Sequence, residues 1–343
     1  MLKFTVIGDF HYEICCYPST VDDIDKIVED SHQKNVDFIL HLGDFCCNYK
    51  NSPEVVDALL NNKYNIPVFG VMGNHEIQWD NKVEDVIDCL TNREVVFGEP
   101  IYNETKSAHY YVDIKDFRLI GTDTNFVYSP ERDVWERKMK FIRPEDTILD
   151  LSLAPLQLEW LEKTIADAAA QNKKVIVASH AGFIGDPWLI PSPDTDAVQA
   201  IFAKYPKTVL TAINGHTHKD NFEVRNGVAY FDVNAARFGT WIRTAKNHYE
   251  KEHTFPFTVC DKEGKRLCTI DMSYRDITMG PESWFYQDAI WATVTLTEDG
   301  HITIDGKKSE WAYGLKPDKY EGMGENYYNA CHPYITDQDA QVW

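Results

Sequence analysis

Five short polar clusters in the sequence combine glycine or serine with aspartate, histidine and asparagine. They are Gly8-Asp9-Phe10-His11, Gly43-Asp44, Gly73-Asn74-His75-Glu76, Ser179-His180 and Gly215-His216-Thr217-His218. Carboxylate oxygen, amide oxygen and imidazole nitrogen are the ligands that hard and borderline divalent metals accept. Neighbouring glycines let short side chains reach inward without steric conflict. The clusters therefore predict a metal centre.

The spacing within the clusters suggests how each ion is held. Asp9 and His11 stand two positions apart, as do His216 and His218. Residues two apart in extended backbone project from the same side, so each pair is expected to grip one ion. Asp44 is the natural bridge, because one carboxylate can bind two ions through its two oxygens. The neutral amide of Asn74 adds an oxygen ligand without more negative charge, which leaves the centre net positive towards a phosphate.

The ordered set resembles the calcineurin-like metallophosphoesterase superfamily, whose blocks read D-x-H, G-D, G-N-H-[D/E], H and G-H-x-H. All five blocks are present between residues 8 and 218. The resemblance implies a first metal site of Asp9, His11, Asp44 and His218 and a second of Asp44, Asn74, His180 and His216. In that family the residue matching His75 is not a ligand but contacts the leaving-group oxygen or the phosphate. The implied fold is α/β, a four-layer α/β/β/α sandwich of two mixed sheets.

The expected activity is hydrolysis of a phosphate ester at two divalent metal ions. Two ions about 3.5–4 Å apart acidify a bridging hydroxide, which attacks phosphorus in line. His75 is expected to stabilise or protonate the departing alkoxide. A small phosphodiester is slightly preferred over a phosphomonoester as substrate. Ligands without thiolate favour Mn²⁺ and also admit Fe, Zn, Co or Ni.

The same comparison narrows the branch and sets the alternatives. Purple acid phosphatases carry a tyrosine three residues after the bridging aspartate, where this chain has Cys47. Protein Ser/Thr phosphatases carry Asp-Arg-Gly shortly after the G-D block, where this chain reads Asp44-Phe-Cys-Cys-Asn. Both branches are therefore disfavoured. The chain is more similar to the broad bacterial-type group that includes class III cyclic-nucleotide phosphodiesterases. Two alternatives stay open, another dinuclear metallohydrolase and a non-catalytic scaffold protein of the same fold.

Each polar cluster follows a segment predicted to be a strand. Alternating apolar patterns predict strands at 2–7, 38–42, 67–72, 174–178 and 209–213, two more within 108–123, and helices at 20–34, 53–62 and 155–171. Hairpins are expected at 224–233 and 291–304. Loops beyond the carboxyl ends of such strands gather at one sheet edge. We expect a single domain over residues 1–343, with elaborations around 125–150 and 240–288 and a C-terminal hairpin at 291–304 that completes a sheet.

Composition limits the partners. The chain has 54 acidic and 34 basic residues among 343, a formal charge of −20. Such a surface repels polyanions, so long nucleic acid and anionic membranes are poor partners and a small phosphate ester is the expected one. No apolar run approaches the roughly 20 residues that cross a bilayer. The expected location is cytoplasmic, because no signal-peptide cleavage site is apparent and irregularly spaced cysteines suit reduced thiols.

Several residues near the clusters have two interpretations. Glu76 is expected to make a structural hydrogen bond, and Asp123 either supports a ligand or forms a turn. The pairs Cys15/Cys16 and Cys46/Cys47 are interpreted as buried apolar residues rather than as sulfur ligands. Aromatic residues between Trp284 and Tyr313 could stack on a nucleobase, or belong to the core.

Overall fold

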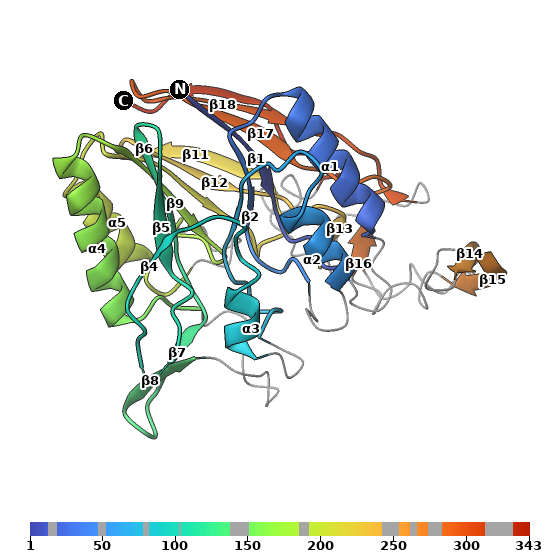
Figure 1. The fold of residues 1–343 in the computed structure, drawn as a ribbon, viewed down its shortest axis with the longest axis horizontal. Coiled ribbons are helices and arrows are strands. Elements are labelled where there is room, and N and C mark those ends of the chain that lie inside the picture. Colours follow the sequence, from blue (N-terminus) through green and yellow to red (C-terminus); the bar gives the residue numbers. More distant parts are fainter. Residues whose placement is uncertain are drawn as a thin grey trace, which may run out of the picture.

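The structure, a computed structural model, contains two large β-sheets that pack face to face between two layers of helices (Figure 1). It describes residues 1–12, 19–46, 53–77, 82–102, 104–137, 151–184, 192–241, 254–260, 266–273, 283–312 and 332–343. The predicted Cys15/Cys16 pair, Cys47 and Tyr313 lie outside these ranges.

The first sheet has six strands in the order β19-β18-β17-β1-β2-β3. Its parallel half is β1, β2 and β3, and β17 pairs antiparallel with β1 on the other side. The strands are β1 (Leu2–Ile7), β2 (Phe38–His41), β3 (Val68–Gly70), β17 (Ala292–Leu296), β18 (His301–Gly306) and β19 (Gln338–Gln341).

The second sheet has seven strands in the order β11-β12-β10-β9-β6-β5-β4. Strands β6, β9, β10 and β12 run parallel, while β11, β5 and β4 pair antiparallel with their neighbours. The strands are β4 (Val96–Phe97), β5 (Tyr110–Ile114), β6 (Phe117–Gly121), β9 (Lys174–Ser179), β10 (Val209–Asn214), β11 (Asn221–Arg225) and β12 (Val228–Asp232).

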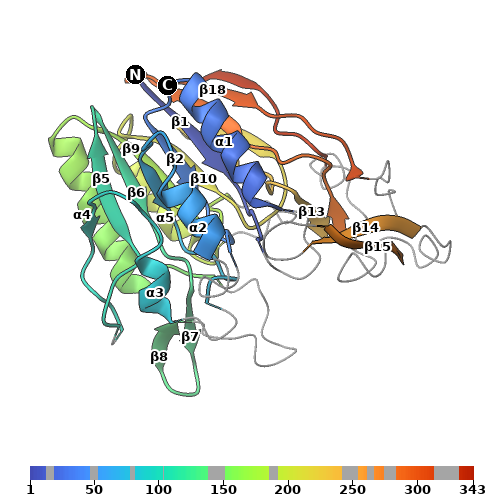
Figure 2. The same cartoon turned by 45° about the vertical axis from the view of Figure 1, so that its right-hand side comes forward.

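Helices cover the outer faces of both sheets. Helices α1 (Val21–Gln33), α2 (Pro53–Leu60) and α3 (Val83–Ile87) lie on the side of the first sheet, and α4 (Pro155–Ala170) and α5 (Thr195–Ala203) lie on the side of the second (Figure 2). A capping box starts α1, since Thr20 Oγ1 accepts from Asp23 N at 3.3 Å and Asp23 Oδ2 accepts from Thr20 N at 3.0 Å. Among the described residues, no helix is long and apolar enough to cross a membrane.

Three layers of apolar side chains explain this stacking. The central layer lies between the sheets and includes Phe4, Leu40, Ile176 and Phe231. A second layer packs below α1 and α2, and a third packs below α4 and α5. Central strands buried on both faces are therefore almost continuously apolar, as in other α/β proteins. The expected four-layer α/β/β/α arrangement is confirmed.

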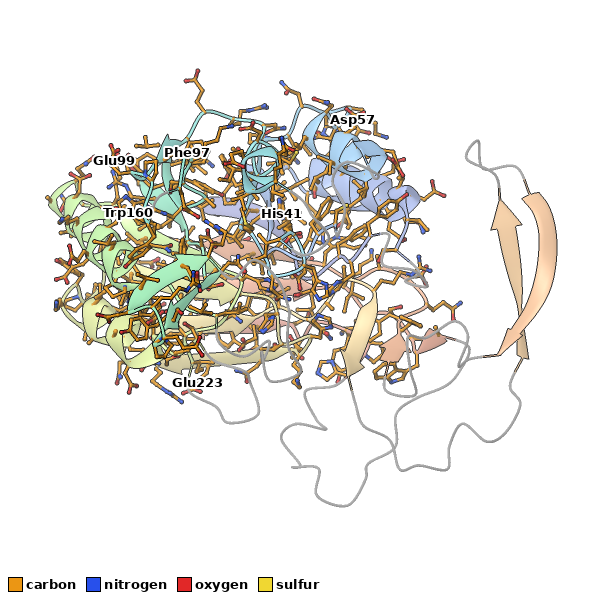
Figure 3. All side chains as sticks on the ribbon, turned by 90° about the horizontal axis from the view of Figure 1, so that it is seen from below. His41, Asp57, Phe97, Glu99, Trp160 and Glu223 are labelled. Atoms are coloured by element: carbon orange, nitrogen blue, oxygen red, sulfur yellow. The ribbon has the colours of Figure 1, made fainter. Side chains whose placement is uncertain are left out.

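The interior also holds polar side chains. His41 lies in the interior of the molecule in Figure 3, whereas Asp57 of α2 and Glu223 of β11 are labelled at opposite outer edges. His41 is buried at the end of β2 and its ring packs beside Phe45, with centroids 5.1 Å apart. It is therefore a packing residue of its strand.

Three two-stranded sheets stand apart from the large ones. Strands β7 (Phe126–Ser129) and β8 (Val134–Arg137) form one, β13 (Phe238–Trp241) and β16 (Ser283–Phe285) another, and β14 (Thr254–Cys260) and β15 (Arg266–Ser273) the third. Tyr286 and Trp291, which lie between β16 and β17 in the sequence, are buried. These two aromatic side chains therefore belong to the core and do not form a stacking surface.

Candidate metal centre

The carboxyl ends of five central strands from both sheets meet at one place. The loops after β1, β2 and β3 come from the first sheet, and those after β9 and β10 from the second. They carry every residue predicted as a ligand, and each of these is at most 9% exposed: Asp9, His11, Asp44, Asn74, His180, His216 and His218. A polar cluster this deeply buried needs internal partners or a bound ion.

One group of donors gathers around Asp9. The ligand atoms of Asp9, His11 and His218 all lie within 4.8 Å of one another. His11 Nε2 is 3.0 Å from His218 Nε2, which in turn is 3.4 Å from Asp9 Oδ1. Two imidazole nitrogens and a carboxylate oxygen therefore converge on one point.

A second group gathers around Asp44. The ligand atoms of Asp44, His180 and His216 also lie within 4.8 Å of one another. His180 Nε2 is 2.9 Å from Asn74 Oδ1 and 3.4 Å from Asp44 Oδ2. His180 Nδ1 lies 2.7 Å from the carbonyl oxygen of Leu42, an acceptor only, so Nδ1 carries the proton. His216 Nε2 is buried without a hydrogen-bond partner in the part of the chain that the structure describes.

His75 lies between the two groups and is the more open residue. Its Nε2 is 3.8 Å from Asp44 Oδ2, and its side chain is 22% exposed. Its backbone N–H donates to Asp44 Oδ1 at 2.7 Å, which fixes the start of its side chain relative to that carboxylate. The ligand atoms of His11, Asp44 and His75 also lie within 4.8 Å of one another. The ring can therefore approach either a metal ion or a molecule that enters from solvent.

The backbone at the centre differs from the extended geometry that the spacing suggested. Four of the predicted ligands have left-handed φ angles: His11 at 51°, Asp44 at 47°, His216 at 68° and His218 at 52°. The expectation that each pair projects from extended backbone is therefore wrong, and tight turns direct these side chains. Left-handed backbone is unfavourable for residues other than glycine, and clusters of it occur at functional sites.

Glu76 joins two of the loops. Its Oε2 accepts from the backbone N–H groups of Asp44 and Gly73 at 2.8 and 2.7 Å. Its Oε1 accepts from those of Phe45 and Cys46 at 2.6 and 3.3 Å. The structural role expected for Glu76 is confirmed, since this one carboxylate holds the loop after β2 against the loop after β3.

The titration behaviour follows from burial and close charges. Burial favours the neutral form of Asp44, but the adjacent His180 and His75 outweigh it and hold the pKa of Asp44 well below its usual range. Burial also opposes protonation of His180, and the carboxylate of Asp44 outweighs it, raising the pKa of His180 to about 10. Burial and the charge of His180 lower the pKa of His216 to about 3. The environment of His180 therefore stabilises a positive charge, and a bound cation would be favoured there for the same reason.

The donor set fits divalent cations. Two carboxylates, four imidazoles and one amide surround two adjacent points. Their facing nitrogen and oxygen atoms are 2.9–3.4 Å apart. At these distances their lone pairs would repel one another unless a cation or a proton lies between them. No thiol takes part in the groups found among the described residues. Cys46 is buried, as expected of an apolar residue.

Sequence reasoning missed three residues beside the centre. Of the two roles expected for Asp123, the structure shows the turn, since Oδ1 accepts from Asn125 N at 3.0 Å, and its Oδ2 pairs with Arg137 Nη1 at 2.6 Å rather than with a predicted ligand. Thr124, Asn125 and Arg137 were not anticipated. No motif identifies them, although four consecutive polar residues at a predicted strand end are a usable signal.

Several curated proteins are similar to this chain. Human "Cyclic GMP-AMP phosphodiesterase SMPDL3A" is 23% identical over 274 residues, 73% of this chain and 55% of the relative. "Manganese-dependent ADP-ribose/CDP-alcohol diphosphatase" of Arabidopsis thaliana is 24% identical over 252 residues, 64% of this chain and 78% of that protein. The chain spans about half the length of SMPDL3A.

The fold and the sequence lead to the same family. The crystal structure of a dimetal phosphatase from Danio rerio superposes with a TM-score of 0.51 at 16% identity, covering 88% of this chain and 95% of that one, which shows the shared fold. A family model described as calcineurin-like phosphoesterase matches residues 2–220. The chain therefore belongs to the calcineurin-like phosphoesterase family.

Proposed function

We propose that this protein hydrolyses small phosphate esters with two divalent metal ions. One observation carries the proposal: donors from both sheets converge in two adjacent groups, Asp9-His11-His218 and Asp44-His180-His216. The first ion would be held by Asp9, His11, Asp44 and His218, and the second by Asp44, Asn74, His180 and His216. Asp44 lies between the groups, which suits a shared ligand.

When bound, the two ions would supply Lewis-acid chemistry, polarising the phosphoryl oxygens and acidifying a bridging water so that a hydroxide attacks phosphorus. Mn²⁺ is the preferred metal, because the donors are imidazole, carboxylate and amide and the Arabidopsis relative is named as manganese-dependent. Fe, Zn, Co and Ni suit the same donors.

His75 is the proposed catalytic residue. Its ring is the most exposed in the centre, so a substrate can reach its Nε2. Asp44 accepts the backbone N–H of His75 and so fixes where this side chain begins. The protonated ring would donate a hydrogen bond and then a proton to the leaving alkoxide oxygen.

A small phosphodiester is the proposed substrate class, slightly ahead of a phosphomonoester. The two relatives described above are named for cleaving a phosphodiester and diphosphate linkages. The charge of −20 disfavours long nucleic acid and anionic membranes. The irregular spacing of the cysteines and the free thiol of Cys89 suit a reducing compartment, for which we propose the cytoplasm.

We also propose that residues 1–343 form one domain with elaborations around 125–150 and 240–288. Pairing of β17 with β1 supports this, because it brings the C-terminal hairpin into the first sheet.

The test combines metal analysis with hydrolysis. Chelator-stripped protein is titrated with Mn²⁺ and then assayed with bis(4-nitrophenyl) phosphate and 4-nitrophenyl phosphate. We expect about two equivalents of metal and faster hydrolysis of the diester, and Asp44→Asn should weaken both equivalents together. Two bound ions without turnover on either ester or on a panel of phosphorylated metabolites would favour a scaffold protein. Binding of one ion or none by folded protein would overturn the dinuclear centre.

A further inference from the structure

Four consecutive polar residues after β6 have no solvent exposure. Thr122, Asp123, Thr124 and Asn125 are each 0% exposed. Burying polar side chains is unfavourable unless they are hydrogen-bonded, so a run of four has a structural purpose. None of them belongs to the donor groups of the metal centre.

The run contacts the chain beside two proposed ligands. Asn125 Nδ2 donates to the carbonyl oxygen of Met72 at 3.0 Å, two residues before Asn74. Thr124 Oγ1 accepts from the backbone N–H of Ala181 at 3.3 Å, immediately after His180. Met72 follows the first sheet and Ala181 follows the second. One short segment therefore connects the two loops whose side chains meet at 2.9 Å between Asn74 Oδ1 and His180 Nε2.

Asp123 holds Asn125 in a single orientation. Its Oδ1 accepts from the backbone N–H of Asn125 at 3.0 Å and from Asn125 Nδ2 at 2.9 Å. Because Nδ2 donates to both Asp123 and Met72, the amide cannot be reversed without bringing oxygen against oxygen. Gln157 of α4 clamps the backbone of Asp123, accepting from its N–H at 2.8 Å and donating to its carbonyl oxygen at 2.7 Å.

Arg137, the last residue of β8, pairs with Asp123 of the same segment. Its side chain is 6% exposed, and Nη1 pairs with Asp123 Oδ2 at 2.6 Å while Nε pairs with Glu104. The guanidinium carbon lies 4.8 Å from the ring centroid of Phe126. Two carboxylates thus balance this buried cation, and breaking such a group is costly. The segment is rigidly fixed to α4 and β8.

We propose that Asn125 and Thr124 are positioning residues for the second ion site, holding the chain at Met72 and Ala181 so that Asn74 and His180 face the same ion. This inference rests on the proposed function, because it concerns the affinity of that ion. Outer partners of metal ligands typically change affinity by about 10- to 100-fold when removed.

The test measures Mn²⁺ binding to chelator-stripped protein by calorimetry. Asn125→Ala should lower the Mn²⁺ affinity of the second site by about tenfold or more and leave the affinity of the first site within about twofold of the wild type. Thr124→Val keeps the side-chain volume and removes only the acceptor for Ala181. It should weaken the same equivalent about threefold, as loss of one neutral hydrogen bond implies.

The matched control is Asn62→Ala. Asn62 is also a buried asparagine, and its Nδ2 donates to the carbonyl oxygens of Leu59 and Ile66 at 3.0 Å each, away from the metal loops. We expect it to lower the melting temperature of the metal-free protein and to leave both equivalents unchanged. The difference between the two asparagine variants separates positioning from general stability.

Three results would overturn the inference. In the first, Asn125→Ala and Thr124→Val bind the second equivalent as tightly as the wild type. In the second, Asn62→Ala weakens it equally. In the third, the wild type binds no Mn²⁺, and the metal centre itself then fails. A wild type that binds two ions but hydrolyses no ester fails only the proposed activity. If Asn125→Ala does not fold, the conservative Thr124→Val decides.

Discussion

His75 is the residue whose role is least fixed by geometry. Its side chain is 22% exposed and its Nε2 is 3.8 Å from Asp44 Oδ2, close enough to approach an ion. His216, by contrast, is buried with Nε2 directed into the centre. A ligand and a proton donor at these two positions should respond differently to truncation.

We expect His75→Ala to keep both ions and the fold while turnover falls by a factor on the order of 10²–10⁴. His216→Ala should instead weaken the second ion. The defect of His75→Ala should be larger for an alkyl phosphodiester than for a nitrophenyl ester, because nitrophenolate leaves without protonation. Metal analysis together with kinetics on both esters checks this. Equal defects on the two esters, or metal loss in His75→Ala, would exclude the leaving-group role.

At the scale of single residues, the sequence predicted which side chains gather at the centre but not the backbone conformation that directs them. Aspartate, histidine and asparagine in ordered blocks carry the chemistry, so every predicted ligand lies at the centre. The left-handed φ of His11 or His218 is set by the turn around it and has no local sequence pattern. Thr124, Asn125 and Arg137 were missed because their role comes from contacts with residues distant in sequence, such as Met72.

At the scale of elements, the loops after β2 and β3 depend on Glu76. Four backbone N–H groups donate to its carboxylate, those of Asp44, Phe45, Cys46 and Gly73. Burial, with the nearby charge of Asp44, raises the pKa of Glu76 to about 7. The geometry of both loops therefore rests on one buried side chain that is not itself among the proposed ligands.

Glu76→Ala should lower the free energy of unfolding by at least about 3 kcal/mol, because it leaves several buried donors without their acceptor at about 1–3 kcal/mol each. Urea titration of metal-free protein measures this. The control is Glu223→Ala on β11, an outer-edge glutamate paired with Arg225 Nε at 2.7 Å (Figure 3). It should change the free energy by less than about 1 kcal/mol. Equal effects of the two substitutions would contradict the role of Glu76 in holding the loops after β2 and β3 together.

Elements with strong periodicity were predicted well. Strands β1, β2, β9 and β10 and helices α1 and α4 lie where their apolar patterns indicate, with ends shifted by a residue or two. Helix α5 (Thr195–Ala203) was missed because it is short and follows a proline-containing segment. The local β7–β8 hairpin was missed, and the pairing of β13 with β16 could not be predicted because about 40 residues separate the two strands.

Across the whole molecule, buried neutral histidines should make stability depend on pH. His109 is buried against Trp160, with ring centroids 4.5 Å apart, and burial lowers its pKa to about 4. Its unfolded value is near 6.5. The folded state then binds fewer protons than the unfolded state between these values, so this stability is present above pH 6.5 and is lost as pH falls towards 4.

We expect His109→Gln to lose less stability than the wild type between pH 7 and pH 5, by about 2 kcal/mol. Urea titrations of both proteins at the two pH values measure this difference directly. Other titrating groups contribute equally to both proteins and cancel. Parallel loss of stability in the two proteins would show that His109 is protonated at pH 5 without unfolding.

The net charge of −20 also acts on the whole molecule, since it opposes long polyanions outside the metal centre. Small phosphodiesters should therefore be cleaved far faster than long single-stranded DNA at physiological salt. Product analysis with both substrates under the same Mn²⁺ loading checks the ratio. Efficient cleavage of the DNA would mean that a locally basic face guides it to the centre.

The distance in sequence between facing donors has a consequence for how the protein is made. His11 and His218 meet at 3.0 Å although 207 positions separate them. A ribosome synthesises Asp9 and His11 first and His216 and His218 much later, so neither proposed ion site can close until β10 has joined the second sheet. Occupation of the proposed sites by metal would then follow synthesis of β10. A nascent chain stalled before residue 216 would lack His216 and His218, so each of the two donor groups would be incomplete.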